Sequence, residues 1–441
     1  MKDRRGSGKG GRLAAAVCLA ALAGCSGGGG SSGSSSGTSP TEPTTVANTA
    51  PITVGFGALG PSGGYVNGLW TSVVICIPGS TTNCQTIPNV LVDTGSVGLR
   101  LLDSVVTVSL PTAQVSGNAL QECVQFADFS YVWGPVAMAT VQFPGTGEAA
   151  SQVPGQAANS GIPIHMIAAN PAAPVPSSCL VTSPSPGQTV DANTVEILGA
   201  NGILGVGLFP QDCGSYCASN ATADEFFTCP GGLCASVAVP LTLQPWNPVS
   251  AFSSADTNGL LITLPSVGAG GAATVSGSMI FGIGTQSDNA IGSAQVLEVD
   301  PYGNFPQAVF NGVTYNSPNN GSFIDSGSNA IFFSDAASLA GTGILECGRD
   351  ETGYYCPKAT IPFTVTVYGT NSAHTAVPFS IANADSLFAT GFAAFSNLGG
   401  DSGTGPSTDY VDLGLPFFFG RTIFFGISGA SMSYPNGYWA F

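Results

Sequence analysis

Basic residues are scarce in this 441-residue chain, which has 9 Lys and Arg residues against 25 Asp and Glu residues. Five of the nine basic residues fall within the first 12 positions. The rest of the chain therefore sets four basic residues against 24 acidic ones, a net charge near −20. So little positive charge leaves nothing to neutralise phosphate groups, which excludes nucleic acid as a partner.

The sequence also lacks long segments with apolar residues at helical spacing, and charged residues make up only 8% of it. Short β-branched and aromatic runs alternate with turn residues, consistent with 61 Gly and 31 Pro. This pattern predicts an all-β protein with few, short helices. The two histidines, His165 and His374, stand in no recognisable motif. We expect both to be ordinary core or surface residues rather than bases or metal ligands.

Residues 1–24 are predicted to be a lipoprotein signal peptide. A basic stretch is followed by the apolar run Leu13 to Ala23, and Leu22-Ala23-Gly24-Cys25 resembles a lipobox. Cys25 would then carry lipid; the alternative is an ordinary cysteine after an ordinary signal. Residues 25–51, rich in Gly, Ser, Thr and Pro, are predicted to form a linker. Because Ser26 rather than Asp follows Cys25, we expect a bacterial outer-membrane anchor rather than an inner-membrane one.

Ten cysteines remain once Cys18 and Cys25 are set aside, and an even number in an exported chain favours disulfides. Proximity in sequence pairs Cys76 with Cys84 and Cys347 with Cys356. Cys213, Cys217, Cys229 and Cys234 lie in one Gly-rich insertion, and we expect them to pair among themselves. Cys123 and Cys179 are then left to pair with each other. A zinc site in the insertion is the alternative, although its spacings are not those of a C-x2-C site.

The chain presents an aspartate twice in the same local pattern. Asn89 to Leu102, NVLVDTGSVGLRLL, runs from an apolar stretch into Asp93-Thr94-Gly95-Ser96 and out through another apolar stretch. Gly321 to Phe333, GSFIDSGSNAIFF, repeats this arrangement around Asp325-Ser326-Gly327-Ser328. Each acid thus ends a predicted strand at a Gly-containing turn with nearby hydroxyls, which favours two related halves that bring their carboxylates together. Asp401-Ser402-Gly403-Thr404 has no flanking strand and is predicted to be a loop.

Two later segments accompany these turns. Ile203-Leu204-Gly205 follows the first turn, and Asp412-Leu413-Gly414 follows the second, with an acid where the first copy has an apolar residue. Ser276 to Gly284, GSMIFGIG in its core, opens the second half. The two Asp turns, the two later segments and this Gly-rich strand follow one another in an order that resembles the pepsin-like aspartic proteases. The resemblance spans roughly residues 52–441.

The resemblance implies a bilobal, all-β pepsin-like acid protease fold with two related β-barrel-like lobes and an interlobe cleft. Residues 52–248 would form the N-terminal lobe and residues 249–441 the C-terminal lobe. It also implies that Asp93 and Asp325 are the catalytic dyad. Residues of both turns would support the dyad: Thr94, Gly95, Ser96, Ser326, Gly327 and Ser328. Of these, Thr94 and Ser326, which directly follow the two acids, would reach across to the backbone of the opposite lobe.

The departures from the family pattern concern substrate handling. Arg100 stands where the family has a Trp, and Phe126 where it has the Tyr of a flap hairpin. Tyr131 and Trp133 are the other candidates for covering the cleft, with exposed strand aromatics as the alternative. The linker also offers no Lys or Arg that would let it act as an inhibitory pro-segment.

The expected function is therefore that of an envelope-tethered aspartic endopeptidase that acts on peptides or proteins through a two-Asp activated water. The alternative is a catalytically inactive binding or scaffolding lipoprotein with a pepsin fold. We expect no metal or other cofactor, a monomer, and a membrane contact through lipidated Cys25.

Overall fold

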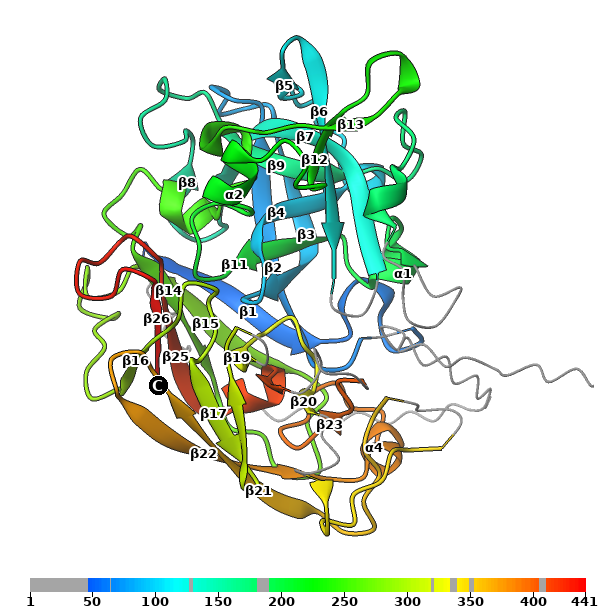
Figure 1. The fold of residues 1–441 in the computed structure, drawn as a ribbon, viewed down its shortest axis with the longest axis vertical. Helices are drawn as coiled ribbons and strands as arrows, with labels where there is room; N and C mark the ends of the chain where they lie inside the picture. Colours follow the sequence, from blue (N-terminus) through cyan, green and yellow to red (C-terminus); the bar gives the residue numbers. More distant parts are fainter. Residues whose placement is uncertain are drawn as a thin grey trace, which may run out of the picture.

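The computed structural model describes residues 47–63, 65–126, 130–180, 190–318, 321–333, 339–348, 353–403 and 410–441. The chain is all-β, with 41% strand and 10% helix (Figure 1). This confirms the fold class predicted from composition. Helices in the described residues are short: α1 (Val195–Leu198), α2 (Ser215–Ser219), α4 (Ala384–Phe388) and the 3-10 turns η1 (Gly57–Leu59), η2 (Asp103–Val105), η3 (Ser177–Cys179), η4 (Pro230–Gly232), η5 (Leu241–Leu243), η6 (Pro248–Ala251) and η7 (Leu415–Phe418).

Six strands of the first half close into a barrel. Each pairs with the next in this order, and the last returns to the first: β2 (Gly68–Cys76), β3 (Cys84–Asp93), β11 (Gly202–Val206), β4 (Val97–Leu102), β9 (Ile162–Ile167) and β7 (Ser130–Gln142). Their Val, Ile and Leu side chains form much of the main core. Closure leaves the first Asp turn, between β3 and β4, fixed at the end of two fully paired strands.

Shorter strands extend the barrel on its outer side. β6 (Asn118–Gln125) forms a hairpin with β7 and also pairs with β12. The remaining strands of this half are β5 (Gln114–Val115), β8 (Ala149–Ala150), β10 (Val190–Asp191), β12 (Phe226–Thr228) and β13 (Ala235–Ser236). The β6–β7 hairpin is the segment in which the sequence places a flap, and its residues 127–129 lie outside the described residues.

The two halves share one sheet through strand β1 (Thr49–Gly55), the dark blue arrow of Figure 1. It pairs with β2 on one side and with β15 on the other. The sheet continues through the second half as β15 (Val275–Phe281), β14 (Gly259–Leu264), β25 (Arg421–Gly426), β26 (Tyr438–Ala440) and β16 (Val296–Glu298). The predicted linker therefore ends too late at Pro51, because Ala50, Ile52 and Val54 already alternate into the core.

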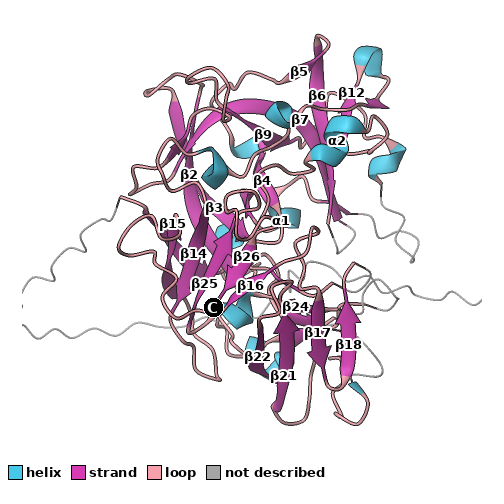
Figure 2. Ribbon diagram, turned by 60° about the vertical axis from the view of Figure 1, so that its left-hand side comes forward, coloured by secondary structure: helices cyan, strands magenta, loops and turns pink. Residues whose placement is uncertain are grey.

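Two four-stranded sheets complete the second half (Figure 2). One has the order β18 (Val313–Asn316), β17 (Gln307–Phe310), β21 (Ile361–Tyr368) and β22 (His374–Ile381). The other has the order β19 (Phe323–Ile324), β24 (Val411–Leu413), β20 (Ile331–Phe333) and β23 (Gly399–Gly400). Phe333 packs edge-on against Phe310 and Phe363 between these sheets, which ties the second Asp turn to a phenylalanine-rich core.

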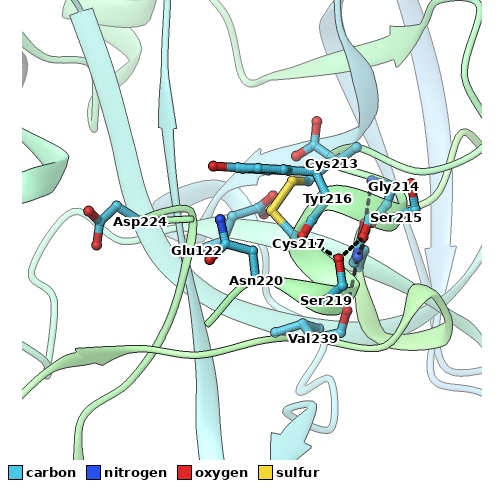
Figure 3. Close-up of a disulfide and its surroundings, with 12 residues drawn as sticks. Glu122, Cys213, Gly214, Ser215, Tyr216, Cys217, Ser219, Asn220, Asp224 and Val239 are labelled. Carbon is cyan, nitrogen blue, oxygen red and sulfur yellow. Dashed lines mark hydrogen bonds between the residues drawn. A yellow bond between two sulfur atoms is a disulfide. The ribbon is translucent and has the colours of Figure 1, made fainter. Parts of the chain in front are cut away.

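Three disulfides confirm the pairs predicted from proximity: Cys76–Cys84, Cys123–Cys179 and Cys347–Cys356. The four cysteines of the insertion pair internally, as expected, and the structure gives the pairing as Cys213–Cys217 and Cys229–Cys234. Figure 3 shows the Cys213–Cys217 bond, which ties α2 to the loop before it. The zinc alternative for the insertion is wrong, because all four of its thiols are consumed in disulfides and zinc requires thiolates.

Within the described ranges, no helix is both long and apolar enough to cross a membrane. The predicted signal peptide, Cys25 and the linker up to residue 46 lie outside those ranges.

Candidate active site

The two Asp turns are held by the same strand arrangement. β11 lies parallel to β3 and places Leu204 opposite Val92, one residue before Asp93. β24 lies parallel to β19 and places Leu413 opposite Ile324, one residue before Asp325. The Leu-Gly pairs noted in the sequence are thus the partner strands of the two acids. Gly205 and Gly414 follow, and a Cβ on Gly414 would lie 2.0 Å from the Ala330 carbonyl oxygen, so only glycine permits this close approach.

The residues after the two acids exchange hydrogen bonds across the halves. The Ser326 backbone N–H donates to Thr94 Oγ1 at 2.8 Å, and the Thr94 N–H donates to Ser326 Oγ at 3.1 Å. Ser326 Oγ in turn donates to the Val92 carbonyl at 2.7 Å. Both hydroxyl residues are buried. These reciprocal contacts, which the resemblance implies, lock the two turns against each other across 232 residues of sequence.

The turns bring the carboxyl groups of Asp93 and Asp325 together. The Gly95 N–H lies 2.9 Å from Asp93 Oδ1 and 3.0 Å from Asp325 Oδ1, so it donates to both. The Gly327 N–H donates to Asp325 Oδ1 at 2.7 Å. Outside the pair, Ser96 Oγ donates to Asp93 Oδ2 at 2.5 Å and Ser328 Oγ to Asp325 Oδ2 at 3.0 Å. Each acid therefore has an inner oxygen on the shared side and an outer oxygen fixed by its own turn.

Each turn glycine leaves space for the opposite acid. A Cβ on Gly95 would lie 2.5 Å from Asp325 Cγ, and one on Gly327 would lie 2.6 Å from Asp93 Oδ1. Both distances are far inside van der Waals contact. The third position of each turn is glycine because a carboxyl group from the other half occupies the volume of its side chain.

For the peptidase activity that the resemblance implies, we expect Gly327→Ala to lower kcat/KM about 100-fold, because the methyl group displaces the Asp93 carboxyl, which is held by two hydrogen bonds. Its stability loss should be about 1–3 kcal/mol, as in other overpacked sites. Gly268→Ala is the matched control, since a Cβ there meets nothing within 4 Å. Steady-state kinetics of both variants decide the matter, and equal activities would contradict this account of the turn.

The electrostatics of the pair favour one shared proton. Burial, then the neighbouring carboxyls of Asp93 and Asp412, raise the pKa of Asp325 well above its ordinary value. Asp93 is 8% exposed, whereas Gly95 at the tip of the turn is exposed. The acids are thus desolvated on the inside but reachable from the surface. A pair of this kind can hold an acid and a base side by side.

Two residues that the sequence did not mark support the second turn from the first half. Tyr65 Oη donates to the Gly327 carbonyl at 3.0 Å, and its ring packs edge-on against Trp70. The buried Asn67 Nδ2 donates to the Asn329 carbonyl at 2.8 Å. Their partners lie 262 residues away, so no local pattern reveals them. Asp412, which the sequence marks only as a departure, is buried beside Ser328.

Arg100 is not a cleft residue, which corrects the expectation from its place in the motif. Its side chain is fully buried, donates to the Val97 carbonyl at 2.5 Å and forms an ion pair with Asp212. Glu122 lies 3.8 Å from the same guanidinium and 3.2 Å from His165 Nδ1. We call Arg100, Glu122, His165, Asp212 and Glu225 the buried ion cluster. It lies between β4, β6 and β9 and the Cys213–Cys217 disulfide, beside which Figure 3 draws Glu122.

The buried ion cluster contains three acids that are close enough together to be compared with a metal site. Carboxylate oxygens of Glu122, Asp212 and Glu225 lie within 4.8 Å of one another. The Arg100 guanidinium already lies among them and supplies the positive charge. His165 is a core residue, as expected, and burial followed by Arg100 lowers its pKa well below the ordinary value, so it is neutral.

The cluster makes folding stability depend on pH. Burial, then Asp212, raise the pKa of Glu225 to about 8, and the pKa of Glu122 is raised by the same two causes. Between pH 4.5 and about 8 the folded chain therefore holds protons that the unfolded chain has lost, and stability falls as pH rises. His165 acts oppositely below pH 6.5. We expect a Tm roughly 5 °C higher at pH 5.5 than at pH 8 by calorimetry; a Tm that rises towards pH 8 would contradict these assignments.

The aromatic flap candidates also need correction. Trp133 is 1% exposed and donates to the Ala173 carbonyl, and Tyr131 is buried with it beside the Cys123–Cys179 disulfide. Neither is an exposed strand aromatic or part of a cover over the Asp pair. Phe126 is half-buried and packs against the apolar cluster that contains Tyr65 and Trp70. Of the flap candidates, Phe126 is therefore the one that packs against the cluster containing Tyr65, whose hydroxyl contacts the second Asp turn.

The chain has no match among curated proteins. Residues 44–441 match the family described as "Protein of unknown function (DUF3443)". The match begins just before β1 and covers both Asp turns, all five disulfides and the final strand. Because it spans nearly the whole chain, the protein belongs to the DUF3443 family.

Proposed function

We propose that this protein is an aspartic endopeptidase that hydrolyses peptide bonds through a water activated by Asp93 and Asp325. The observation that carries the proposal is the shared Gly95 N–H, which lies within 3.0 Å of an oxygen from each carboxyl group. Two carboxyls brought this close cannot both ionise freely, because their negative charges repel, and one of them therefore keeps a proton at the pH where the other is a base.

The environment of Asp325 supports one division of the two roles. Asp325, whose pKa is raised, holds the proton, and Asp93 is the base. A water between them would lose a proton to Asp93 as its oxygen attacks the scissile carbonyl carbon, while Asp325 protonates the carbonyl oxygen. In the second step Asp93 gives its proton to the amide nitrogen and the C–N bond breaks. The new hydroxyl returns a proton to Asp325, which restores both acids.

Two features support the finer prediction of a bilobal pepsin-like fold. Each Asp turn lies between an incoming and an outgoing strand, with a third strand parallel to the incoming one. The cross-bonds of Thr94 and Ser326 relate the turns by an approximate two-fold arrangement. On this proposal the substrate lies between the halves, over Gly95 and Gly327, and the β6–β7 hairpin covers it.

The alternative is a pepsin-fold binding or scaffolding protein that does not turn over. Phe126 favours it, because an apolar ring at this place cannot donate the hydrogen bond of a flap tyrosine. Arg100 no longer favours it, because its substitution serves the buried ion cluster rather than the acid pair. The intact support of both carboxyls weighs towards catalysis.

The remaining parts of the proposal concern location and partners. We propose that lipid on Cys25 tethers the body to the bacterial envelope, that the body acts as a monomer, and that its partner is an unstructured peptide or protein. Metabolic labelling with a fatty acid, with Cys25→Ser as the unlabelled control, tests the tether independently of activity.

The test of the function is hydrolysis of an unstructured polypeptide by purified full-length protein in mild detergent at pH 3–7. We expect internal cleavage next to bulky apolar residues in the acid range, blocked by a statine-type transition-state mimic. Binding of the peptide without hydrolysis would favour the scaffolding alternative.

A further inference from the structure

A short segment of the first half, residues 65–67, lies against the second half. The Asn67 side chain is fully buried and donates to the Asn329 carbonyl at 2.8 Å and to the Phe395 carbonyl at 3.0 Å. Its Oδ1 accepts the Phe395 N–H at 2.7 Å, and its own backbone N–H donates to the Ala393 carbonyl at 2.7 Å. These bonds hold the segment at a fixed place beside the second Asp turn, and we call residues 65–67 the clasp.

Gly327 is the residue of the second turn that cannot fix its own conformation. It has no side chain, because the Asp93 carboxyl occupies the space of a Cβ, and a glycine backbone has more freedom to rotate than that of any other residue. Two hydrogen bonds orient it instead. Its N–H donates to Asp325 Oδ1 at 2.7 Å, and its carbonyl accepts from Tyr65 Oη of the clasp at 3.0 Å. The Tyr65 hydroxyl therefore holds one side of a residue whose other side holds Asp325.

The Tyr65 ring is packed within the first half. It lies edge-on to the Trp70 ring, with 5.8 Å between the ring centroids. Both rings belong to one apolar cluster with Val124 and Val132, which pair with each other across the β6–β7 hairpin. Phe126, which follows β6, packs against the same cluster. The residue that orients Gly327 therefore shares a packed cluster with the hairpin that the proposed function places over the substrate.

We propose that Tyr65 is a positioning residue that couples the seating of the β6–β7 hairpin to the second Asp turn. The inference rests on the proposed peptidase function. When the hairpin packs down over a bound peptide, the cluster holds the Tyr65 ring, and the hydroxyl holds Gly327 with its N–H on Asp325. Contact energy between the peptide and the hairpin is then used to order the acid pair, so it raises kcat rather than lowering KM.

The first test is a double-mutant cycle on kcat with the full-length protein. Tyr65→Phe removes the hydroxyl and keeps the ring, so we expect kcat about 10-fold lower and KM within about 2-fold of the wild type. Phe126→Ala should also lower kcat about 10-fold. The double variant should lose about 10-fold rather than about 100-fold, because both changes break the same link. Losses that multiply would overturn the proposal.

Tyr355→Phe is the matched control for this cycle. Tyr355 is a buried tyrosine of the second half whose hydroxyl donates to the carbonyl of Phe333, in β20 rather than in the turn. Its substitution should leave kcat within about 2-fold of the wild type and combine additively with Phe126→Ala. A loss of kcat as large as that of Tyr65→Phe would mean that any buried tyrosine hydroxyl matters equally, and this would overturn the positioning role.

Amide hydrogen exchange tests the link without turnover. In the folded, oxidised wild type the Gly327 N–H is protected by its bond to Asp325. Tyr65→Phe and Phe126→Ala should each speed exchange in the peptide spanning residues 324–330 about 10-fold, and Tyr355→Phe should not. Unchanged exchange in Phe126→Ala would overturn the coupling, whether or not the wild type cleaves peptides. Faster exchange beside a wild type that cleaves nothing would support the coupling and contradict the peptidase function alone.

Discussion

Asp93→Asn and Asp325→Asn should each lower kcat for peptide hydrolysis at least about 10³-fold, with little change in stability. An asparagine at position 93 keeps the shape: its one oxygen accepts the Gly95 N–H, and its amide NH2 faces Ser96 Oγ, which can accept from it. It can neither take the proton of the water nor donate one to the carbonyl. Because the two acids act as a unit, the double variant should be no worse than either single one.

Asp401→Asn is the matched control for this prediction. Asp401 begins a third copy of the Asp-Ser/Thr-Gly-Ser/Thr motif. Its carboxyl group accepts a hydrogen bond from the Gly403 N–H at 3.2 Å, as Asp93 accepts one from the Gly95 N–H. It lacks the partner acid, so its substitution should leave kcat within about 2-fold of the wild type. Full activity in Asp93→Asn would show that hydrolysis comes from elsewhere.

Arg100→Met should destabilise the fold by about 3–5 kcal/mol at pH 8. The guanidinium is fully buried and is the cation of the buried ion cluster, so its removal leaves Asp212 and Glu122 without a counter-charge. The loss should shrink in acid, where Glu122, whose pKa is raised by burial, takes up a proton. Guanidinium denaturation at pH 5 and pH 8 measures both effects.

Arg421→Met is the control for Arg100→Met. Arg421 lies over the ring of Phe417 and donates to its carbonyl, but it is only half-buried and forms no ion pair with a described residue. We expect a loss of about 1 kcal/mol. The triple variant Arg100→Met with Glu122→Gln and Asp212→Asn should recover part of the stability, because it removes the uncompensated charges. No recovery would mean that Arg100 acts through packing alone.

The sequence predicts the Asp turns well because their signal is local. A strand, an acid, a glycine and two hydroxyls lie within a few residues, and the structure places Asp93 and Asp325 accordingly. The short-range disulfides follow from the same locality, since Cys76 and Cys84 end two neighbouring strands of one hairpin. The all-β fold follows from the turn-rich composition.

The contacts that the sequence does not reveal connect distant segments. From its place in the motif, Arg100 is predicted to be a cleft residue. In the structure it is buried in the core, where it pairs with Asp212, 112 residues later in the sequence. Tyr65 belongs to no recognisable sequence motif, yet its hydroxyl donates a hydrogen bond to the second Asp turn. Asp412 matches an apolar segment only weakly in sequence, and the structure buries it where its carboxyl group, after burial and Asp93, raises the pKa of Asp325. Each case depends on a partner side chain that local patterning leaves unspecified.

The central claim, hydrolysis by two shared carboxyls, is tested most directly with a random peptide library and mass spectrometry of the products from pH 3 to pH 7. The wild type should cut in the acid range with a defined preference for the residues around the bond, while Asp93→Asn/Asp325→Asn should cut nothing. Silence from a folded, oxidised wild type at every pH, or equal cutting by the double variant, would contradict the claim.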